Sequence, residues 1–179
     1  MQLTIGQKVA YPNQGVCIVE EFNQRMIGTR SMSGYSLRVL SDNSKIFVPQ
    51  ENAGSVGIRP LISSSQCRKL IDKLSEDFEP VSCDWKMRSR EFTDRLRSGD
   101  VFQVAEVLKM LTFLSHEKKL SFREQTLLEK SKFLILSEIT NTCGNGQTLT
   151  ESEVIGLVEK ACTKHLITQP TVMPAAVHL

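Results

Sequence analysis

The sequence predicts an α+β protein, in which a small N-terminal antiparallel β barrel is followed by an all-helical C-terminal domain. Short β-branched runs between turn residues fill the chain up to residue 60. From residue 63 onward, apolar residues recur with the spacing of amphipathic helices. Glycine and proline separate the two patterns. We therefore expect domains at residues 1–62 and 63–165, and a flexible tail at residues 166–179.

The N-terminal part is predicted to consist of short strands joined by turns. Lys8–Tyr11 is β-prone and ends at Pro12–Gly15, which has strong turn chemistry. Val16–Phe22 is a β-branched run, and Tyr35–Leu40 alternates apolar with polar residues, as a half-buried strand does. Lys45–Pro49 reads as a further strand that ends at a proline. Strands of this length and spacing favour a barrel of SH3 or Tudor type.

Four aromatic side chains of this part allow two interpretations. They are Tyr11, Phe22, Tyr35 and Phe47. They either fill the barrel, which is the commoner role of aromatic residues, or form a cage for a modified lysine.

The helical part is predicted to begin with a short helix and a linker. Ser63–Ser65 offers N-caps for an amphipathic helix over Gln66–Leu74. An acidic linker that contains Pro80 follows. Asp84 is then the favoured N-cap of the next helix, with Ser82 as the alternative.

The next helix, over residues 85–97, carries the only tryptophan of the chain. At about 100° per residue, Trp85, Phe92 and Leu96 fall on one stripe of this helix. Basic residues border the stripe on both sides: Lys86, Arg90 and Arg97 on one flank, and Arg88 and Arg95 on the other. From this pattern alone, Trp85 is either a core anchor or a ring that faces outward toward a partner.

Three further helices are predicted. Val101–Leu114 is apolar over most of its circumference and is expected to be the buried central helix. Ser121–Glu124 has the pattern of a capping box at the start of a helix that ends near Thr140. Thr150–Glu153 starts the last helix, which is expected to end near Lys164.

Composition argues against several functional classes. The formal net charge is only +2, so tight non-specific binding to nucleic acid is not implied without a local patch or a second partner. The sequence contains no glycine-rich nucleotide-binding loop, no His-Glu-x-x-His and no Gly-x-Ser-x-Gly. We therefore expect no enzyme and no cofactor.

The cysteines and the hydropathy pattern predict the compartment. The five cysteines include no Cys-x-x-Cys pair, so we expect reduced thiols and no metal site. The first residues have no apolar stretch of the signal-peptide kind, and no run reaches the ~20 apolar residues that a membrane span needs. We expect a cytoplasmic protein with no membrane contact.

Several motifs occur here in an order that resembles the CarD/CdnL family of bacterial transcription regulators. Tyr11–Gly15 reads Tyr-Pro-x-x-Gly, and Val56–Arg59 reads Val-Gly-Ile-Arg. Trp85 follows with basic residues behind it, and then Ser98–Asp100 precedes Val104–Val107, which reads Val-Ala-Glu-Val. The resemblance covers about residues 1–142. The N-terminal part alone also resembles the polymerase-interacting domain of the transcription–repair coupling factor.

The resemblance implies a regulator that stabilises the open promoter complex. The N-terminal module would bind the β subunit of RNA polymerase, and the helical domain would reach promoter DNA at the upstream edge of the bubble. Carried onto this chain, the family places polymerase contacts at Arg25, Met26 and Ile27, and at Phe47, which stands where the family often has a basic residue. Trp85 would be the wedge in the minor groove, without sequence specificity. The basic residues that would hold neighbouring phosphates are Lys86, Arg88 and Arg90.

Two expectations and one alternative complete the hypothesis. We expect a monomer whose Trp85 ring is at least partly exposed near the helix start, while Phe92 and Leu96 pack inward. The alternative is an interaction module that binds a peptide or a modified lysine and has no role on DNA.

Overall fold

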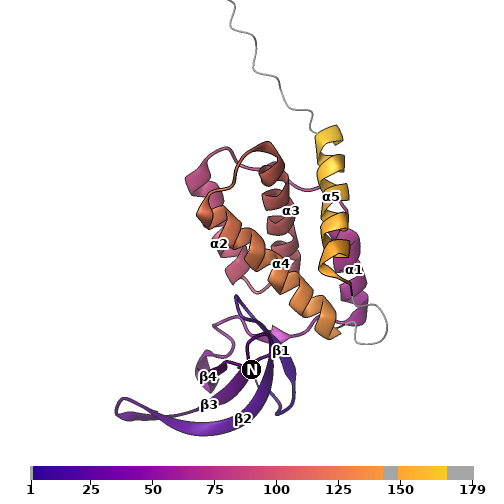
Figure 1. The fold of residues 1–179 in the computed structure, drawn as a ribbon. Helices are drawn as coiled ribbons and strands as arrows, with labels where there is room; N and C mark the ends of the chain where they lie inside the picture. Colours follow the sequence, from indigo (N-terminus) through magenta and orange to yellow (C-terminus); the bar gives the residue numbers. More distant parts are fainter. Residues whose placement is uncertain (1, 143–148, 169–179) are drawn as a thin grey trace, which may run out of the picture.

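The computed structural model describes residues 2–142 and 149–168, in which a β-sheet part lies against a bundle of helices (Figure 1). The elements follow the predicted order, with strands first and helices after residue 63. The α+β class is therefore confirmed. Most of the expected tail, residues 169–179, lies outside the described residues.

The sheet is antiparallel and has five strands in the order β4-β3-β2-β1-β5. Their bounds are β1 Lys8–Tyr11, β2 Gly15–Ile27, β3 Arg30–Val39, β4 Lys45–Pro49 and β5 Arg59–Pro60. A short 3-10 helix, η1, spans Gln50–Asn52. The core of this part lies on one face of the sheet and includes Val9, Cys17 and Leu37.

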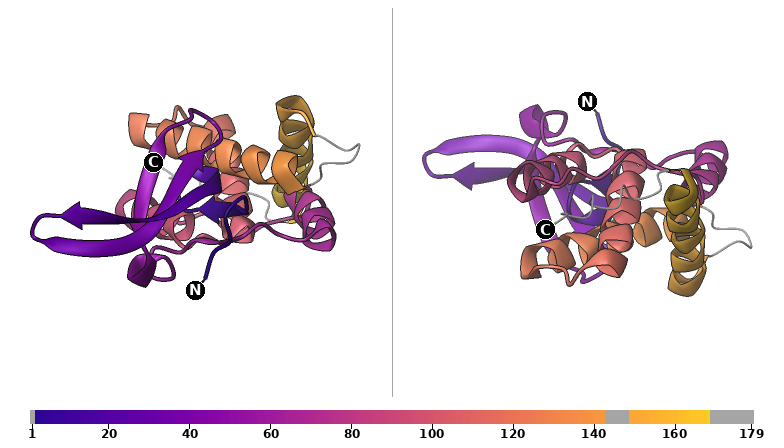
Figure 2. Two further views of the ribbon diagram at one scale, coloured as in Figure 1. Left: turned by 90° about the horizontal axis from the view of Figure 1, so that it is seen from below. Right: turned by 90° about the horizontal axis from the view of Figure 1, so that it is seen from above.

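The small antiparallel barrel of the prediction is present as an open five-stranded sheet. Within the described residues, β4 and β5 are its two edges and do not pair with each other. β5 has only two residues. The register of β2 and β3 shifts between Val19 and Glu21, and beyond this irregularity the two strands continue as a long hairpin (Figure 2). Helix α4 packs against β2, which is an interior strand of the sheet.

The helical part contains five helices among the described residues. They are α1 Ser64–Leu74, α2 Trp85–Arg97, α3 Val101–Glu117, α4 Phe122–Thr142 and α5 Glu151–Thr168. α3 is the buried central helix, as predicted, since it contacts α1, α2, α4 and α5. α5 continues to Thr168, beyond the position expected near Lys164, and so includes the first residues assigned to the tail. None of the described helices is long and apolar enough to cross a membrane.

The predicted helix caps are present in the structure. The Ser63 hydroxyl accepts the N–H of Gln66, and the Gln66 side chain accepts the N–H of Ser63. Asp84 accepts the N–H groups of Lys86 and Met87 at the start of α2. Reciprocal bonds between Ser121 and Glu124 start α4. Such caps satisfy backbone donors that the first helical turn leaves without partners.

The prediction that all cysteines are reduced thiols is wrong for one of them. Cys67 is disulfide-bonded. Cys17, Cys83 and Cys162 are free thiols, and two of them are buried. Burial raises the pKa of Cys17 to about 11 and that of Cys162 to about 12, so both remain protonated at neutral pH. No group of metal-ligating side chains occurs among the residues that the structure describes.

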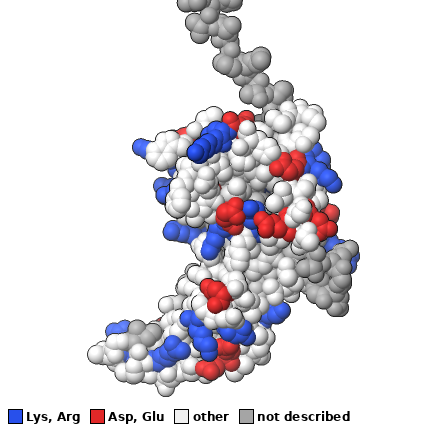
Figure 3. All heavy atoms as spheres, in the orientation of Figure 1, with Lys and Arg blue, Asp and Glu red and all other residues white. Residues whose placement is uncertain are grey.

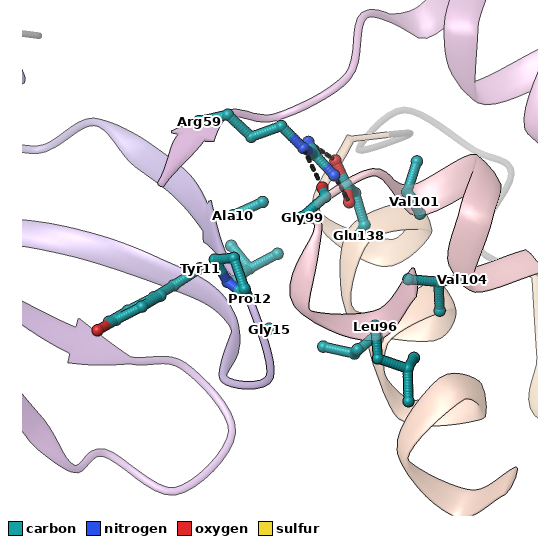
Figure 4. A pocket seen from close by; sticks show the side chains of 12 residues that line it. Ala10, Tyr11, Pro12, Gly15, Arg59, Leu96, Gly99, Val101, Val104 and Glu138 are labelled. Carbon is teal, nitrogen blue, oxygen red and sulfur yellow. Dashed lines mark hydrogen bonds and ion pairs between the residues drawn. The ribbon is translucent and has the colours of Figure 1, made fainter. Parts of the chain in front are cut away.

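The two parts of the molecule are joined by a bidentate ion pair. The Arg59 guanidinium, at the edge of the sheet, donates to both carboxylate oxygens of Glu138 on α4, at 2.5 and 2.7 Å (Figure 4). Glu138 also accepts the backbone N–H of Ile62 at 3.1 Å. The Nε of Arg59 donates to the carbonyl of Gly99, between α2 and α3, at 2.6 Å. One arginine therefore connects the sheet to three helices.

The turn between β1 and β2 packs closely on α4 beside this ion pair. Gly15 has φ +81°, and a Cβ there would lie 2.9 Å from the Phe133 ring. The Val16 N–H donates to the Ser137 hydroxyl at 3.0 Å, and Lys8 donates to Asn141 at 2.9 Å. The small cavity of Figure 4 lies between the turn and the helices and is lined by largely apolar side chains, with Arg59 and Glu138 at its edge. These contacts hold the two parts in one arrangement.

We predict that Glu138→Ala lowers the free energy of unfolding by about 3 kcal/mol, because it leaves the partly buried Arg59 guanidinium and the buried Ile62 N–H without their acceptor. Urea unfolding at neutral pH measures the change. Lys45→Ala is the matched control, since the Lys45 side chain is 62% exposed in its pair with Glu20 and its loss is expected to cost at most about 1 kcal/mol. Equal effects of the two substitutions would contradict the role given to Glu138.

Candidate functional site

Trp85 is the first residue of α2, and 65% of it is exposed. The Asp84 carboxylate accepts the Lys86 N–H at 2.8 Å and fixes where the helix begins. On the same stripe, Phe92 and Leu96 are buried in the helical core. The expectation of an exposed ring beside two inward-facing neighbours is therefore confirmed. The start of α2 therefore presents a large aromatic ring to solvent, while Phe92 and Leu96 anchor the helix in the core.

Three cations on one flank of the stripe remain accessible to solvent. Lys86, Arg90 and Arg97 are all exposed. The Lys86 ammonium lies 5.6 Å from the centre of the Trp85 ring. Arg90 is 88% exposed and its nearest acid, Asp94, is at 3.9 Å, a pair that contributes little in water. This flank can therefore place positive charge next to the exposed ring.

The other flank is already paired, which corrects the prediction for Arg88. Its guanidinium is buried, donating to Glu124 at 2.9 Å and to the carbonyl of Ser82 at 2.6 Å. A phosphate cannot reach it without breaking these bonds. Arg95 is likewise paired, with Glu79 and Glu91. The helical periodicity located Arg88 on the correct flank but could not reveal an acidic partner 36 residues away.

The buried carboxylate of Glu124 ties the start of α2 to the start of α4. Besides Arg88, it accepts from Lys118 at 3.0 Å and from the backbone and hydroxyl of Ser121. Burial alone would raise the pKa of Glu124, but the hydrogen bonds from Ser121, Lys118 and Arg88 outweigh it and lower the pKa to about 2. Glu124 is therefore charged over the whole physiological range.

The residues expected to contact polymerase lie along the β2–β3 hairpin and its neighbour β4. Arg25 and Met26 are exposed near the end of β2, and Ile27 is its last residue. The Arg25 guanidinium lies 5.0 Å from the centre of the Phe47 ring on β4 and is 3.4 Å from the Ser36 hydroxyl. The structure thus brings Arg25 and Phe47 together across the sheet, although 22 positions separate them in the sequence.

Two exposed apolar side chains, one on α2 and one on α4, were missed as candidates. Met87 is 65% exposed, and Phe122, the first residue of α4, is 86% exposed. The capping box predicts where α4 starts, but it does not predict whether the Phe122 side chain is buried or exposed. The available signal was its position, since a side chain at the first helical residue, ahead of the apolar stripe, has few neighbours to bury it.

We predict that Glu124→Gln lowers the free energy of unfolding by about 3 kcal/mol at pH 7, because the folded-state pKa of Glu124 lies near 2 and the ordinary value is 4.5. A carboxyl with a lowered pKa stabilises the folded state above its ordinary pKa, and this contribution is lost as the pH falls from about 4.5 toward 2. Denaturant unfolding across this window measures it.

The glutamine variant is expected to lose less stability than the original chain over the same window. Glu129→Gln is the control, since the Glu129 side chain is 68% exposed. Parallel pH profiles for the original chain and Glu124→Gln would contradict the assignment.

Comparison with known proteins matches both parts of the chain to one family. Residues 3–62 match the CarD-like/TRCF RID domain, and residues 69–154 match the CarD C-terminal domain. The putative transcription factor YdeB of Bacillus subtilis (strain 168) is 24% identical over 135 residues, which cover 75% of this chain and 88% of that protein. The solution structure of the 72-residue N-terminal domain of Myxococcus xanthus CarD is 30% identical, with a TM-score of 0.29, and covers 33% of this chain and 79% of that domain. The chain belongs to the CarD family of transcription regulators.

Proposed function

We propose that this regulator binds RNA polymerase through its β part and stabilises the open promoter complex by inserting Trp85 at the upstream edge of the bubble. The observation that carries the proposal is the exposure of the Trp85 ring, 65%, although Phe92 and Leu96 on the same stripe of the helix are buried. A large apolar side chain in this position contributes nothing to the core that Phe92 and Leu96 form. Its exposure is explained by a partner that receives the ring.

An inserted ring acts on melted DNA more readily than on intact duplex. Unstacking a base step costs on the order of a few kcal/mol. At a fork the bases are already partly unstacked, so insertion of the ring costs less there. Contact with the indole ring then offsets the lost stacking. The ring reads no base edges, so the stabilisation depends on the structure of the fork and not on its sequence.

Two of the three proposed phosphate contacts have the exposure they need. Lys86 and Arg90 are exposed next to Trp85, whereas Arg88 serves the buried pair with Glu124. Figure 3 shows Lys and Arg side chains along the edge of the helical part where α2 begins. Contacts to phosphates add affinity without sequence readout. We therefore assign phosphate binding to Lys86 and Arg90 and a positioning role to Arg88.

Binding to polymerase accounts for the low net charge of the chain. A protein with a formal charge of +2 has little affinity for free DNA. If the β part is bound to polymerase on the promoter, the helical part meets the fork as an intramolecular partner at high effective concentration. The match of residues 3–62 to the CarD-like/TRCF RID domain supports the polymerase as this partner. We place the contact with the β subunit at Arg25, Met26, Ile27 and Phe47.

The alternative of a modified-lysine cage receives little support from the positions of the rings. Tyr35 is buried, and its hydroxyl accepts the Leu3 N–H at 3.1 Å. Phe22 packs on Tyr35 with ring centres 5.0 Å apart, and Phe47 is covered by Arg25. These rings already have partners within the chain.

We predict that Trp85→Ala shortens the lifetime of the open complex about fivefold or more, because it removes a ring–base contact of about 1–3 kcal/mol. The lifetime is measured as the decay of competitor-resistant complexes, with the chain saturating the polymerase. Binding to polymerase stays unchanged, since Trp85 lies outside the β part. Trp85→Phe is expected to retain part of the effect, and Ile155→Ala, another exposed apolar residue, is the control. An unchanged open-complex lifetime for Trp85→Ala would contradict the wedge mechanism.

We also predict that Arg25→Glu weakens capture of the polymerase β subunit about tenfold or more, because it reverses a charge at the proposed contact and removes the cation that covers Phe47. Capture by the immobilised full chain measures the change. Arg30→Glu is the matched control, an exposed arginine at the start of β3 on the same hairpin. Equal capture by both variants would place the polymerase contact elsewhere.

A further inference from the structure

Phe122 has the largest exposed fraction, 86%, among the large apolar side chains that the structure describes. It is the first residue of α4, and the reciprocal bonds between Ser121 and Glu124 fix the backbone there. Glu124 is itself held by Arg88 and Lys118. The ring therefore projects from a rigid helix start and not from a loose segment.

The helix starts that carry Trp85 and Phe122 are joined to each other. The buried Arg88–Glu124 pair joins the first turns of α2 and α4, and Arg123 Nη2 lies 3.4 Å from the Thr93 hydroxyl on α2. Both helices begin at the same edge of the bundle (Figure 1). A single exposed apolar residue needs no explanation. Here Trp85, Met87 and Phe122 all project from two helix starts that one ion pair joins.

The charges around Phe122 favour an anionic partner on the α2 side. Lys118, Lys119 and Arg123 flank it in the sequence and are exposed. Phe122 also borders an open groove toward the β part, and the charged residues that line this groove are Asp42, Glu129 and Lys130. With two carboxylates and one ammonium group, the groove has no excess of positive charge to attract phosphates. A phosphate backbone is therefore drawn to the side of Phe122 where Arg123 meets α2.

We propose that Phe122 is a second aromatic contact to DNA, which stacks on an unpaired base of the separated strands while Lys119 and Arg123 neutralise neighbouring phosphates. This inference rests on the proposed function, because it assumes that α2 lies at melted promoter DNA. The ring has an open face and no polar atom, so it offers stacking without base readout, the chemistry by which proteins hold single strands. Trp85 then acts at the fork, and Phe122 acts on a strand already released from it.

The first test compares open-complex lifetimes with the full chain bound to the polymerase holoenzyme. Phe122→Ala is expected to shorten the lifetime roughly fivefold or more, the usual effect of losing one base–aromatic stack. Phe122→Trp is expected to preserve it, and Ile167→Ala, at 75% exposure on α5, is expected to have no effect. If Trp85→Ala shortens the lifetime and Phe122→Ala does not, the inference fails while the proposed function stands. If neither does, the proposed function fails first.

The second test identifies what covers the ring. A photoreactive benzoylphenylalanine replaces Phe122, and the open promoter complex is irradiated. Crosslinks to a promoter strand in the region of the bubble, absent from complexes on fully paired DNA, are the expected result. Crosslinks only to a polymerase subunit would overturn the inference and would assign Phe122 and its groove to the polymerase contact.

Discussion

The position of the β-sheet part relative to the helical part depends on the hydrogen bonds that the buried carboxylate of Glu138 accepts. It accepts two bonds from Arg59 and one from the Ile62 backbone, and Arg59 also bonds the Gly99 carbonyl between α2 and α3. The open edge of the sheet is thereby fixed to the helical bundle. The β2–β3 hairpin and Trp85 are consequently held at a set separation, which a regulator needs if one part contacts polymerase while the other acts on DNA.

Much of the helical architecture could be predicted from local rules. Asp84 and Ser63 cap the helices that their positions indicated, and the stripe on α2 correctly placed Phe92 and Leu96 in the core. These features depend on residues a few positions apart, so a single sequence contains them. The expectation that Trp85 is exposed rests on its cation-flanked position together with the family resemblance, because composition by itself favours a core anchor.

The predictions failed where the deciding partner is distant in the chain. Arg88 meets Glu124 36 residues away, and Arg59 meets Glu138 79 residues away, so no local pattern reveals either pair. The sheet is open and α4 packs against β2, neither of which strand spacing can show. The same distance effect hid the link between the starts of α2 and α4, which carry Trp85 and Phe122.

The central claim is that the Trp85 ring enters DNA only when the promoter opens. Because Trp85 is the only tryptophan, 5-hydroxytryptophan incorporated in its place can be excited apart from the tryptophans of the polymerase. Its emission is followed in the full chain bound to polymerase, first on a closed promoter and then after opening. Quenching that appears with opening, and is absent on the closed promoter, is the predicted result. Unchanged emission in a complex that still contains the chain would contradict the claim.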